Sequence, residues 1–499
     1  MRRLRSASLG ALILSSAAAA EFRLEPYLQL VEQDSITIVW WSEDEAPGVL
    51  EWGPTAAYGQ QATSAPVPSA AITTVVAGVE DAGAHPYRHE IRVSGLSSNT
   101  VYFYRVTQGP SERASSFRTA PGLETDFTFV VAADPESKAT EPLRNAIHRA
   151  VLDLAATKDP RFLVYAGDLV DQGNAQDDWD SFWSDLTGLA ASIPVYPALG
   201  NHDYDGLSTT LGGNAEPYSQ PFAEEGVARY RAYFSLPGNN HPDSDARSER
   251  YYWMRYGPVS LIVLDTNNDS ISTTSPATNW DTGRYAAHPL RGENEPPEQG
   301  GQGLAPDIHG GVRDAATSLQ YRWLADTLMR ARRESAFVFL VTHHAPYSSF
   351  VHGHPAEQQS GHPLRKLDRL FHHHGVDAVF SGHDESVERS VTKGTRAGGR
   401  PGAHEIHYFL ITTISDPTGL RAPLPDARWQ ARFSRFIYPL ENRRHGYLAV
   451  EIDYIGGGDY RATITPYYFE PGDPGNARLY YDDVTVLRGR IGPRRRDAR

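Results

Sequence analysis

Five short polar clusters interrupt the middle of the chain, and each follows a run of apolar residues. In order they are Asp134, Gly167-Asp168, Gly200-Asn201-His202-Asp203, His343-His344 and Gly382-His383-Asp384-Glu385. Carboxylates, amides and imidazoles are side chains that bind metal ions in proteins. Two cations that share one carboxylate can clamp a phosphoryl group and activate a water molecule to attack it. We therefore interpret the clusters as the ligands of a two-metal site that hydrolyses phosphate esters.

One half of this site follows from ligand chemistry. Asp168 follows a glycine that lets the backbone approach closely, so we expect its carboxylate to bridge the two cations. Asn201 offers a neutral oxygen, and His343 and His383 offer nitrogens that suit Fe, Zn or Mn. We predict that one ion binds among these four side chains, with Asn201 also facing the substrate.

His202 is the predicted general acid of the reaction. It lies one residue after a predicted ligand and directly before Asp203, whose carboxylate we expect to orient or charge the imidazole. The resulting imidazolium can protonate the leaving alkoxide. His352 and His354, on the loop after His343, are candidate contacts for the substrate phosphate, and the alternative for both is an ordinary surface position.

The clusters lie where predicted strands end. Apolar runs indicate strands at residues 127–133, 162–166, 195–199, 336–342 and 378–380, and amphipathic spacing indicates helices at 141–156, 181–191, 319–333 and 364–374. Such alternation is typical of an α/β layer with its site along one edge. Further strands at 251–265, 446–452 and 461–469 favour two sheets packed face to face. The stretches 204–249 and 267–313 show no regular pattern.

The N-terminal part of the chain has a different sequence pattern. Short alternating strands are expected at 35–41, 49–53, 89–93 and 101–106, with turn residues between them. This spacing over about 100 residues indicates an all-β sandwich of the fibronectin type III kind. We therefore divide the chain into a β-sandwich at 21–121, an α/β domain of two packed sheets flanked by helices at 122–487, and a basic tail at 488–499.

Composition limits the possible functions. A formal net charge of −14 argues against general nucleic-acid binding, which relies on clustered lysines and arginines. No apolar run after residue 20 reaches the roughly 18 residues that a membrane-spanning helix needs. Residues 1–20 combine an arginine-rich start, an apolar stretch and small residues, so we expect a signal peptide and a secreted or periplasmic bacterial protein. The absence of cysteine excludes disulfides, and the oligomeric state is not specified.

Several motifs resemble known families. Glu25-Pro26-Tyr27-Leu28-Gln29, Tyr102-Phe103-Tyr104-Arg105-Val106 and Ser116-Phe117-Arg118-Thr119-Ala120-Pro121 resemble the N-terminal domain of purple acid phosphatases. The five clusters resemble the calcineurin-like metallophosphoesterase superfamily. That resemblance implies a β-sandwich flanked by helices, a dinuclear metal centre and phosphate-ester hydrolysis. It also implies metal ligands at Asp134, Asp168, Asn201, His343 and His383, with the leaving-group acid at His202.

Three positions depart from the family pattern. Asp171 stands where purple enzymes carry the tyrosine that gives their colour, so this protein should not be purple. Glu136 and Glu385 stand where related sites carry histidines, or a glycine in the first case. The second cation is then surrounded by Asp134, Glu136, Asp168 and Glu385. Such an all-oxygen set favours a harder ion such as Ca, Mg, Mn or ferric iron.

Three functions of different classes remain open. The first is a secreted metal-dependent phosphoesterase acting on a small monoester or diester. The second is a catalytically weak or inactive metal-binding protein that retains the fold, and the third is a structural envelope protein. We favour the first, because random loss of histidines would not produce two new carboxylates that can still bind metal.

Overall fold

A computed structural model describes most of the chain from Phe22 onward. The described residues are 22–76, 79–81, 83, 85–204, 222–240, 248–267, 319–353, 362–415, 434–437, 445–469, 478–479 and 484–491. The expected signal peptide at 1–20 lies outside them. No helix among these residues is long and apolar enough to cross a membrane.

The front of the chain is an antiparallel β-sandwich, as predicted. One sheet has the order β1 (Phe22–Gln29), β2 (Ser35–Ser42), β8 (Tyr87–Ser94) and β5 (Val67–Pro68), and the other has the order β10 (Ser111–Arg118), β9 (Val101–Gln108), β3 (Val49–Gly53) and β4 (Gln60–Thr63). A small hairpin joins β6 (Thr74–Val76) to β7 (Val79–Asp81). Large side chains such as Trp40, Leu50 and Tyr104 fill the space between the sheets and are fully buried.

A buried histidine sits inside this sandwich. The Ser42 hydroxyl donates to the Asp44 carbonyl, so its oxygen accepts a hydrogen bond from His89 Nε2, which lies 2.8 Å away. His89 Nδ1 then accepts from the Ser64 hydroxyl, also at 2.8 Å. Burial disfavours the charged imidazole and lowers the pKa of His89 to about 4.

Acidification should therefore destabilise the protein through His89. The unfolded chain protonates this imidazole near pH 6.5, whereas the folded protein keeps it neutral down to about pH 4. Stability is full above about pH 6.5 and falls by about 3 kcal/mol as the pH drops to 4, because unfolding takes up a proton in that range. Unfolding of the wild type and His89→Gln should be compared between pH 4 and 7. The same pH dependence in both proteins would contradict the assignment.

Two mixed sheets form the second part of the chain. The first has the order β13 (Val195–Pro197), β12 (Pro160–Tyr165), β11 (Phe127–Ala132), β21 (His445–Gly456), β22 (Asp459–Phe469) and β23 (Arg478–Leu479), with β24 (Thr485–Arg490) also paired to β22. The second has the order β14 (Tyr252–Tyr256), β15 (Val259–Val263), β16 (Phe337–Val341), β17 (Ala378–Ser381), β19 (His404–Leu410), β18 (Glu388–Gly394) and β20 (Ser434–Ile437).

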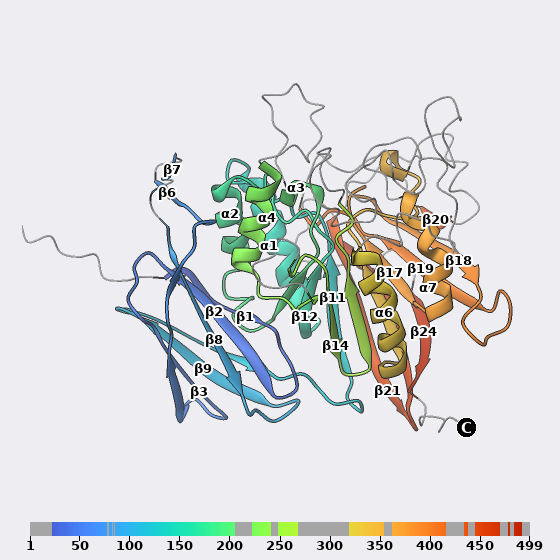
Figure 1. Ribbon diagram of the computed structural model, residues 1–499, viewed down its shortest axis with the longest axis horizontal. Coiled ribbons are helices and arrows are strands. Elements are labelled where there is room, and N and C mark those ends of the chain that lie inside the picture. Colours follow the sequence, from blue (N-terminus) through green and yellow to red (C-terminus); the bar gives the residue numbers. More distant parts are fainter. Residues whose placement is uncertain are drawn as a thin grey trace, which may run out of the picture.

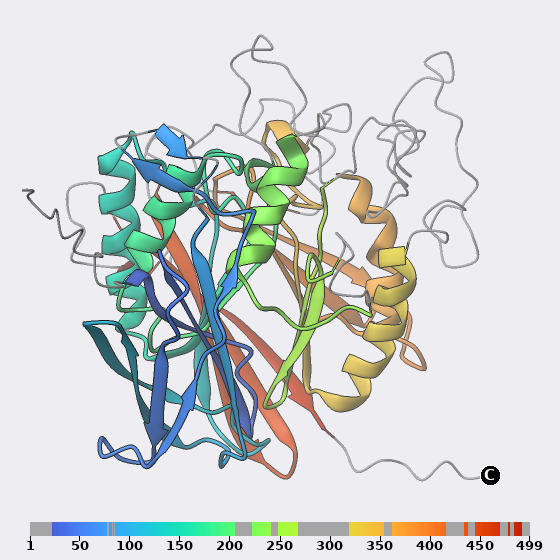
Figure 2. The same ribbon diagram turned by 60° about the vertical axis from the view of Figure 1, so that its left-hand side comes forward.

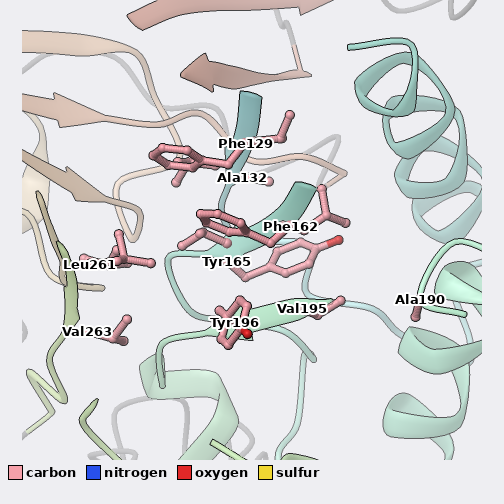
Figure 3. Close-up of a cluster of buried hydrophobic side chains, with 14 of the residues drawn as sticks. Phe129, Ala132, Phe162, Tyr165, Ala190, Val195, Tyr196, Leu261 and Val263 are labelled. Atoms are coloured by element: carbon pink, nitrogen blue, oxygen red, sulfur yellow. The ribbon is translucent and has the colours of Figure 1, made fainter. Parts of the chain in front are cut away.

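The two sheets pack face to face through aromatic and aliphatic side chains, as predicted. Phe129 and Phe162 stack with their ring centroids 4.8 Å apart, and Phe129 lies 6.2 Å from Phe339 of the other sheet. Figure 3 shows this cluster, with Leu261 and Val263 opposite the phenylalanines. Successive side chains of a strand point to opposite faces of the sheet. One face of each sheet therefore packs into this core, and the other face packs against helices.

The helices are α1 (Pro142–Ala156), α2 (Gln176–Leu186), the short α3 (Asn201–Tyr204), α4 (Phe222–Tyr233), α6 (Leu319–Glu334) and α7 (Asp368–His374), with 3₁₀ turns η5 (Val351–Gly353) and η6 (His362–Leu367). Of these, α1 packs on β21, α6 on β15 and β16, and α7 on β18 and β19, so helices cover the outer faces of both sheets. Val338 and Leu340 of β16 pack in a separate cluster with Leu328 of α6 and Phe371 of α7. Figure 1 shows the sandwich in blue beside α1, α2 and α4, with α6 and α7 toward the other side of the molecule, and Figure 2 gives a second view.

The sandwich is bonded directly to the α/β domain. Arg23 lies 2.9 Å from Asp180 of α2, and the Tyr27 hydroxyl donates to the Tyr233 carbonyl at 2.5 Å. The Leu28 amide donates to the Ala190 carbonyl at 2.9 Å. The sandwich therefore supports α2 and α4, the helix that follows the Asn201-His202-Asp203 turn.

Two predictions about regular structure are wrong. The stretch 204–249 contains α4, where Val227, Tyr230 and Tyr233 have helical spacing and are buried. The predicted basic tail from residue 488 begins inside β24, because Arg488 pairs with Arg461 on β22 while Leu487 packs against the core. In both places a few apolar residues and backbone pairing outweigh a polar composition.

Candidate metal centre

The five polar clusters meet where the two sheets adjoin. Asp134, Asp168 and Asn201 follow β11, β12 and β13, which are parallel neighbours in the first sheet. His343 and His383 follow β16 and β17, which are parallel neighbours in the second. Parallel strands place their C-terminal ends at the same edge of a sheet. The packing of the two sheets then brings the two edges together.

The backbone is left-handed at five of the predicted site residues. The φ angles are 51° at Asp134, 39° at Glu136, 52° at Asp168, 76° at His383 and 49° at Glu385. Residues other than glycine seldom adopt this conformation, which costs about 1 kcal/mol or more each and is concentrated at functional sites. The turns after β11 and β17 are also bonded together, because the His383 amide donates to Asp134 Oδ1 at 2.9 Å.

Two glycines allow the close packing of these turns. A Cβ atom at Gly200 would lie 2.1 Å from Asp168 Oδ1, and one at Gly167 would lie 2.5 Å from His343 Nδ1. No side chain fits at these distances. The glycines in Gly167-Asp168 and Gly200-Asn201 therefore let the Asp168 carboxylate approach the neighbouring turn and the His343 ring.

One donor group contains most of the predicted His and Asn side chains. Ligand atoms of Asp168, His343 and His383 lie within 4.8 Å of one another. His343 Nδ1 donates to the Ala166 carbonyl at 2.8 Å, which leaves Nε2 facing Asp168 Oδ2 at 3.1 Å and Asn201 Oδ1 at 2.9 Å. The hydrogen bond to the carbonyl orients the ring, as a supporting bond does for metal-binding histidines.

The charged side chains of this group shift one another's pKa. Burial raises the pKa of Asp168, but the adjacent His343 and His202 outweigh burial and bring it down to about 2. Burial lowers the pKa of His343, but Asp168 and Asp134 outweigh it and raise the value to about 9. Asp168 is therefore ionised at neutral pH, as a bridging ligand must be.

Asp134 and Glu385 lie at the same edge but in no compact donor group. Asp134 is fully buried, and burial raises its pKa well above the ordinary range. Its Oδ2 atom has no hydrogen-bond partner among the described residues. Glu385 is also buried, and its carbonyl accepts from the Thr412 hydroxyl at 3.4 Å. Among the described residues, neither belongs to a group of three ligands within 4.8 Å.

Glu136 lies beside Asp168, and its charge also raises the pKa of Asp134. Its ligand atoms group with those of Asp168 and His202, not with those of Asp134 and Glu385. Its Oε2 atom accepts from Arg144 Nη1 at 2.7 Å, and both side chains are almost fully buried. Glu136, one of the four carboxylates predicted for the second cation, is thus also paired with an arginine.

Neighbouring residues fix the position of His202, the predicted general acid. His202 Nδ1 donates to the Asp171 carbonyl at 2.8 Å, and Nε2 lies 4.0 Å from Glu136 Oε1. Burial lowers the pKa of His202, but the carboxylates of Asp168 and Glu136 outweigh burial and raise it to about 10. The imidazole is thus cationic at neutral pH, with its second proton on Nε2.

The expectation that Asp203 orients His202 is wrong. The Asp203 carboxylate accepts from the backbone amides of Leu169 at 2.8 Å and Gly200 at 2.7 Å. It joins the turn after β12 to the turn after β13, because its side chain points toward these amides. The backbone carbonyl of Asp171 instead orients the ring of His202.

His352, the predicted substrate contact, lies beside His383 and Asp384. Its ring centroid is 4.1 Å from that of His383, and its amide donates to Asp384 Oδ1 at 3.1 Å. His344 lies 4.4 Å from His383 and contacts the Thr266 hydroxyl through Nδ1 at 3.0 Å. His354 is outside the described residues.

Arg144 is the site residue that sequence reasoning missed. It lies in the first turn of α1, eight residues after Glu136, and bonds both the carboxylate and the carbonyl of that residue. Arginine in a helix is ordinary, so its type carried no signal. No pattern in the sequence pointed to it.

Comparisons with known proteins agree with this arrangement. Residues 127–385 match the Calcineurin-like phosphoesterase family, and residues 24–119 match the Purple acid Phosphatase, N-terminal domain. The chain is 22% identical to "Probable purple acid phosphatase 20" of Arabidopsis thaliana over 301 residues, covering 60% of this chain and 55% of that protein. It is 22% identical to "Acid phosphatase type 7" of Mus musculus over 380 residues, covering 72% and 68%.

A solved structure shows the same fold. Purple acid phosphatase PPD1 from yellow lupin (Lupinus luteus) seeds superposes with a TM-score of 0.60 at 16% identity, covering 92% of this chain and 73% of that one. The fold and the donor set together define the class of calcineurin-like metallophosphoesterases. The family match covers more than half of the chain, so this protein belongs to the calcineurin-like phosphoesterase family, with a purple-acid-phosphatase type domain in front. It spans about half the length of the plant relatives that it matches.

Proposed function

We propose that this protein is a metal-dependent hydrolase of small phosphate esters, either monoesters or diesters. One observation carries the proposal. At the junction of the two sheets, Asp168 Oδ2 and Asn201 Oδ1 lie within 3.1 Å of the same nitrogen, His343 Nε2. Carboxylate, amide and imidazole donors converge there in a buried setting, which is a donor arrangement that suits a cation.

The residues fit the metal ions that the family implies. Asp168, Asn201, His343 and His383 would hold Fe, Zn or Mn. A second, harder ion such as Ca, Mg, Mn or ferric iron would lie on the carboxylate side, with Asp134, Glu136 and Glu385 as its other ligands. Burying Asp134 Oδ2 without a hydrogen bond is costly, and a cation would offset that cost. Bound cations would neutralise the phosphoryl charge and acidify a water molecule for attack.

The side chains then have distinct tasks. His202 would deliver its Nε2 proton to the leaving alkoxide, while the Asp171 carbonyl keeps Nδ1 protonated and the ring in place. Asp203 would hold the two turns together through their amides. His352, and His354 as a further candidate, would contact the substrate phosphate together with Asn201.

Metal content and hydrolysis test the proposal together. The purified full chain should carry at least one metal ion and should cleave p-nitrophenyl phosphate or bis(p-nitrophenyl) phosphate. A chelator should abolish the activity, and added Mn, Zn, Fe or Ca should restore it. Metal binding without cleavage of either ester would support the inactive metal-binding alternative. If no metal binds and neither ester is cleaved, the proposal is wrong.

We further propose that the chain is exported in a bacterium after loss of residues 1–20, and that its domains are 21–121 and 122–487. The arginine-rich and apolar start of the chain motivates the first part. N-terminal sequencing of exported protein should find Glu21 first. An unprocessed Met1 would contradict the export proposal.

A further inference from the structure

A buried ion pair lies beside the predicted bridging ligand. Arg144 Nη1 donates to Glu136 Oε2 at 2.7 Å and to the Glu136 carbonyl at 3.0 Å. The side chain of Arg144 is 5% exposed and that of Glu136 is 7% exposed. Charged hydrogen bonds shielded from water are stronger than exposed pairs. The guanidinium is therefore a fixed part of this edge of the site.

The ion pair is also part of a larger charge network. Asp171 Oδ1 lies 3.5 Å from Arg144 Nη1, and its other oxygen lies 3.2 Å from Lys138 Nζ. Glu141 contacts both cations, at 3.2 Å from Arg144 Nε and 3.1 Å from Lys138 Nζ. Asp171 and Glu136 thus both supply carboxylates to the Arg144 guanidinium.

This network touches the donor group directly. The Glu136 amide donates to the Asp168 carbonyl at 2.9 Å, and the Ser137 amide donates to the Leu169 carbonyl at 3.1 Å. The segments after β11 and β12 thus run side by side. The Glu136 side chain therefore contacts the Arg144 guanidinium on one side and lies close to Asp168 and His202 on the other.

We propose that Arg144 is a positioning residue that weakens the second metal position by holding Glu136. The inference rests on the proposed metal-dependent function. A cation bound to Glu136 would lie a few ångströms from a buried guanidinium, and the like charges would repel each other in a poorly screened setting. The protein then binds one ion tightly, among Asp168, Asn201, His343 and His383. A second ion binds more weakly, and Arg144 supplies part of the positive charge on that side.

Titration of the chelator-treated full chain with Mn²⁺ tests this inference by calorimetry and metal analysis. The wild type should show one tight equivalent and a second at least about tenfold weaker. Arg144→Gln removes the charge and should tighten the second equivalent by about tenfold or more while leaving the first unchanged. Arg144→Lys keeps a charge and should resemble the wild type.

Arg149→Gln is the matched control, because Arg149 lies on the same helix with a half-exposed side chain and pairs with Asp185. It should leave both equivalents unchanged. If the wild type binds two equivalents of Mn²⁺ with similar affinity, the inference is overturned, even if no variant folds. An unchanged second equivalent in folded Arg144→Gln would also overturn it. Absence of any Mn²⁺ binding by the wild type would instead refute the proposed metal-dependent function on which it rests.

Discussion

Asp168→Asn should abolish tight metal binding and lower kcat/KM for aryl phosphates by about 10³-fold or more. The substitution preserves shape but removes the charge that we propose bridges the cations. Loss of a supporting residue around a metal ligand already costs about 10- to 100-fold, so loss of a bridging ligand should cost more. Asp168 also faces His343 Nε2 at 3.1 Å, and the variant loses that charge pair. Metal analysis and steady-state kinetics on the same preparation measure both effects.

Asp153→Asn provides the control for this variant. Asp153 is an exposed aspartate on α1, so the same chemical change there should alter neither metal content nor rate. Thermal unfolding of both variants checks that the fold survives. Full metal content and full activity in folded Asp168→Asn would show that the junction of the two sheets is not the metal site.

His202→Ala should lower kcat by about 10²- to 10⁴-fold for esters with poor leaving groups, such as alkyl phosphates. The effect should be much smaller for p-nitrophenyl phosphate, because its leaving group needs little protonation. His202 can donate a proton from Nε2, because its Nδ1 proton is already bound to the Asp171 carbonyl at 2.8 Å. Metal content should remain unchanged, because we assign His202 no ligand role. Rates for a series of esters with different leaving-group pKa values measure the effect.

His373→Ala is a suitable control, because His373 is exposed on α7 and belongs to no candidate donor group among the described residues. It should leave the rates for all esters unchanged. An equal loss for good and poor leaving groups in His202→Ala would assign this residue to binding or structure instead of proton donation. Such a result would leave the metal assignments intact.

Much of the architecture could be predicted because its causes are local. Short strand patterns between turn residues identified β2 and β9, apolar runs identified β11 and β16, and amphipathic spacing identified α1 and α6. The placement of polar residues directly after apolar strands predicted a site at one sheet edge. This logic brought Asp168, Asn201, His343 and His383 together correctly, since parallel strands must end at a common edge.

Only the tertiary structure determined which side chains and backbone amides the site residues contact. Asp203 follows His202 directly, yet its carboxylate binds amides of two other turns. Glu136 has the right type for a ligand, yet Arg144 of α1 also binds it, at 2.7 Å. Type and spacing determine which donors reach the sheet edge. The charge partner of each donor depends on side chains from other elements, and these contacts exist only once the two sheets and their helices have packed.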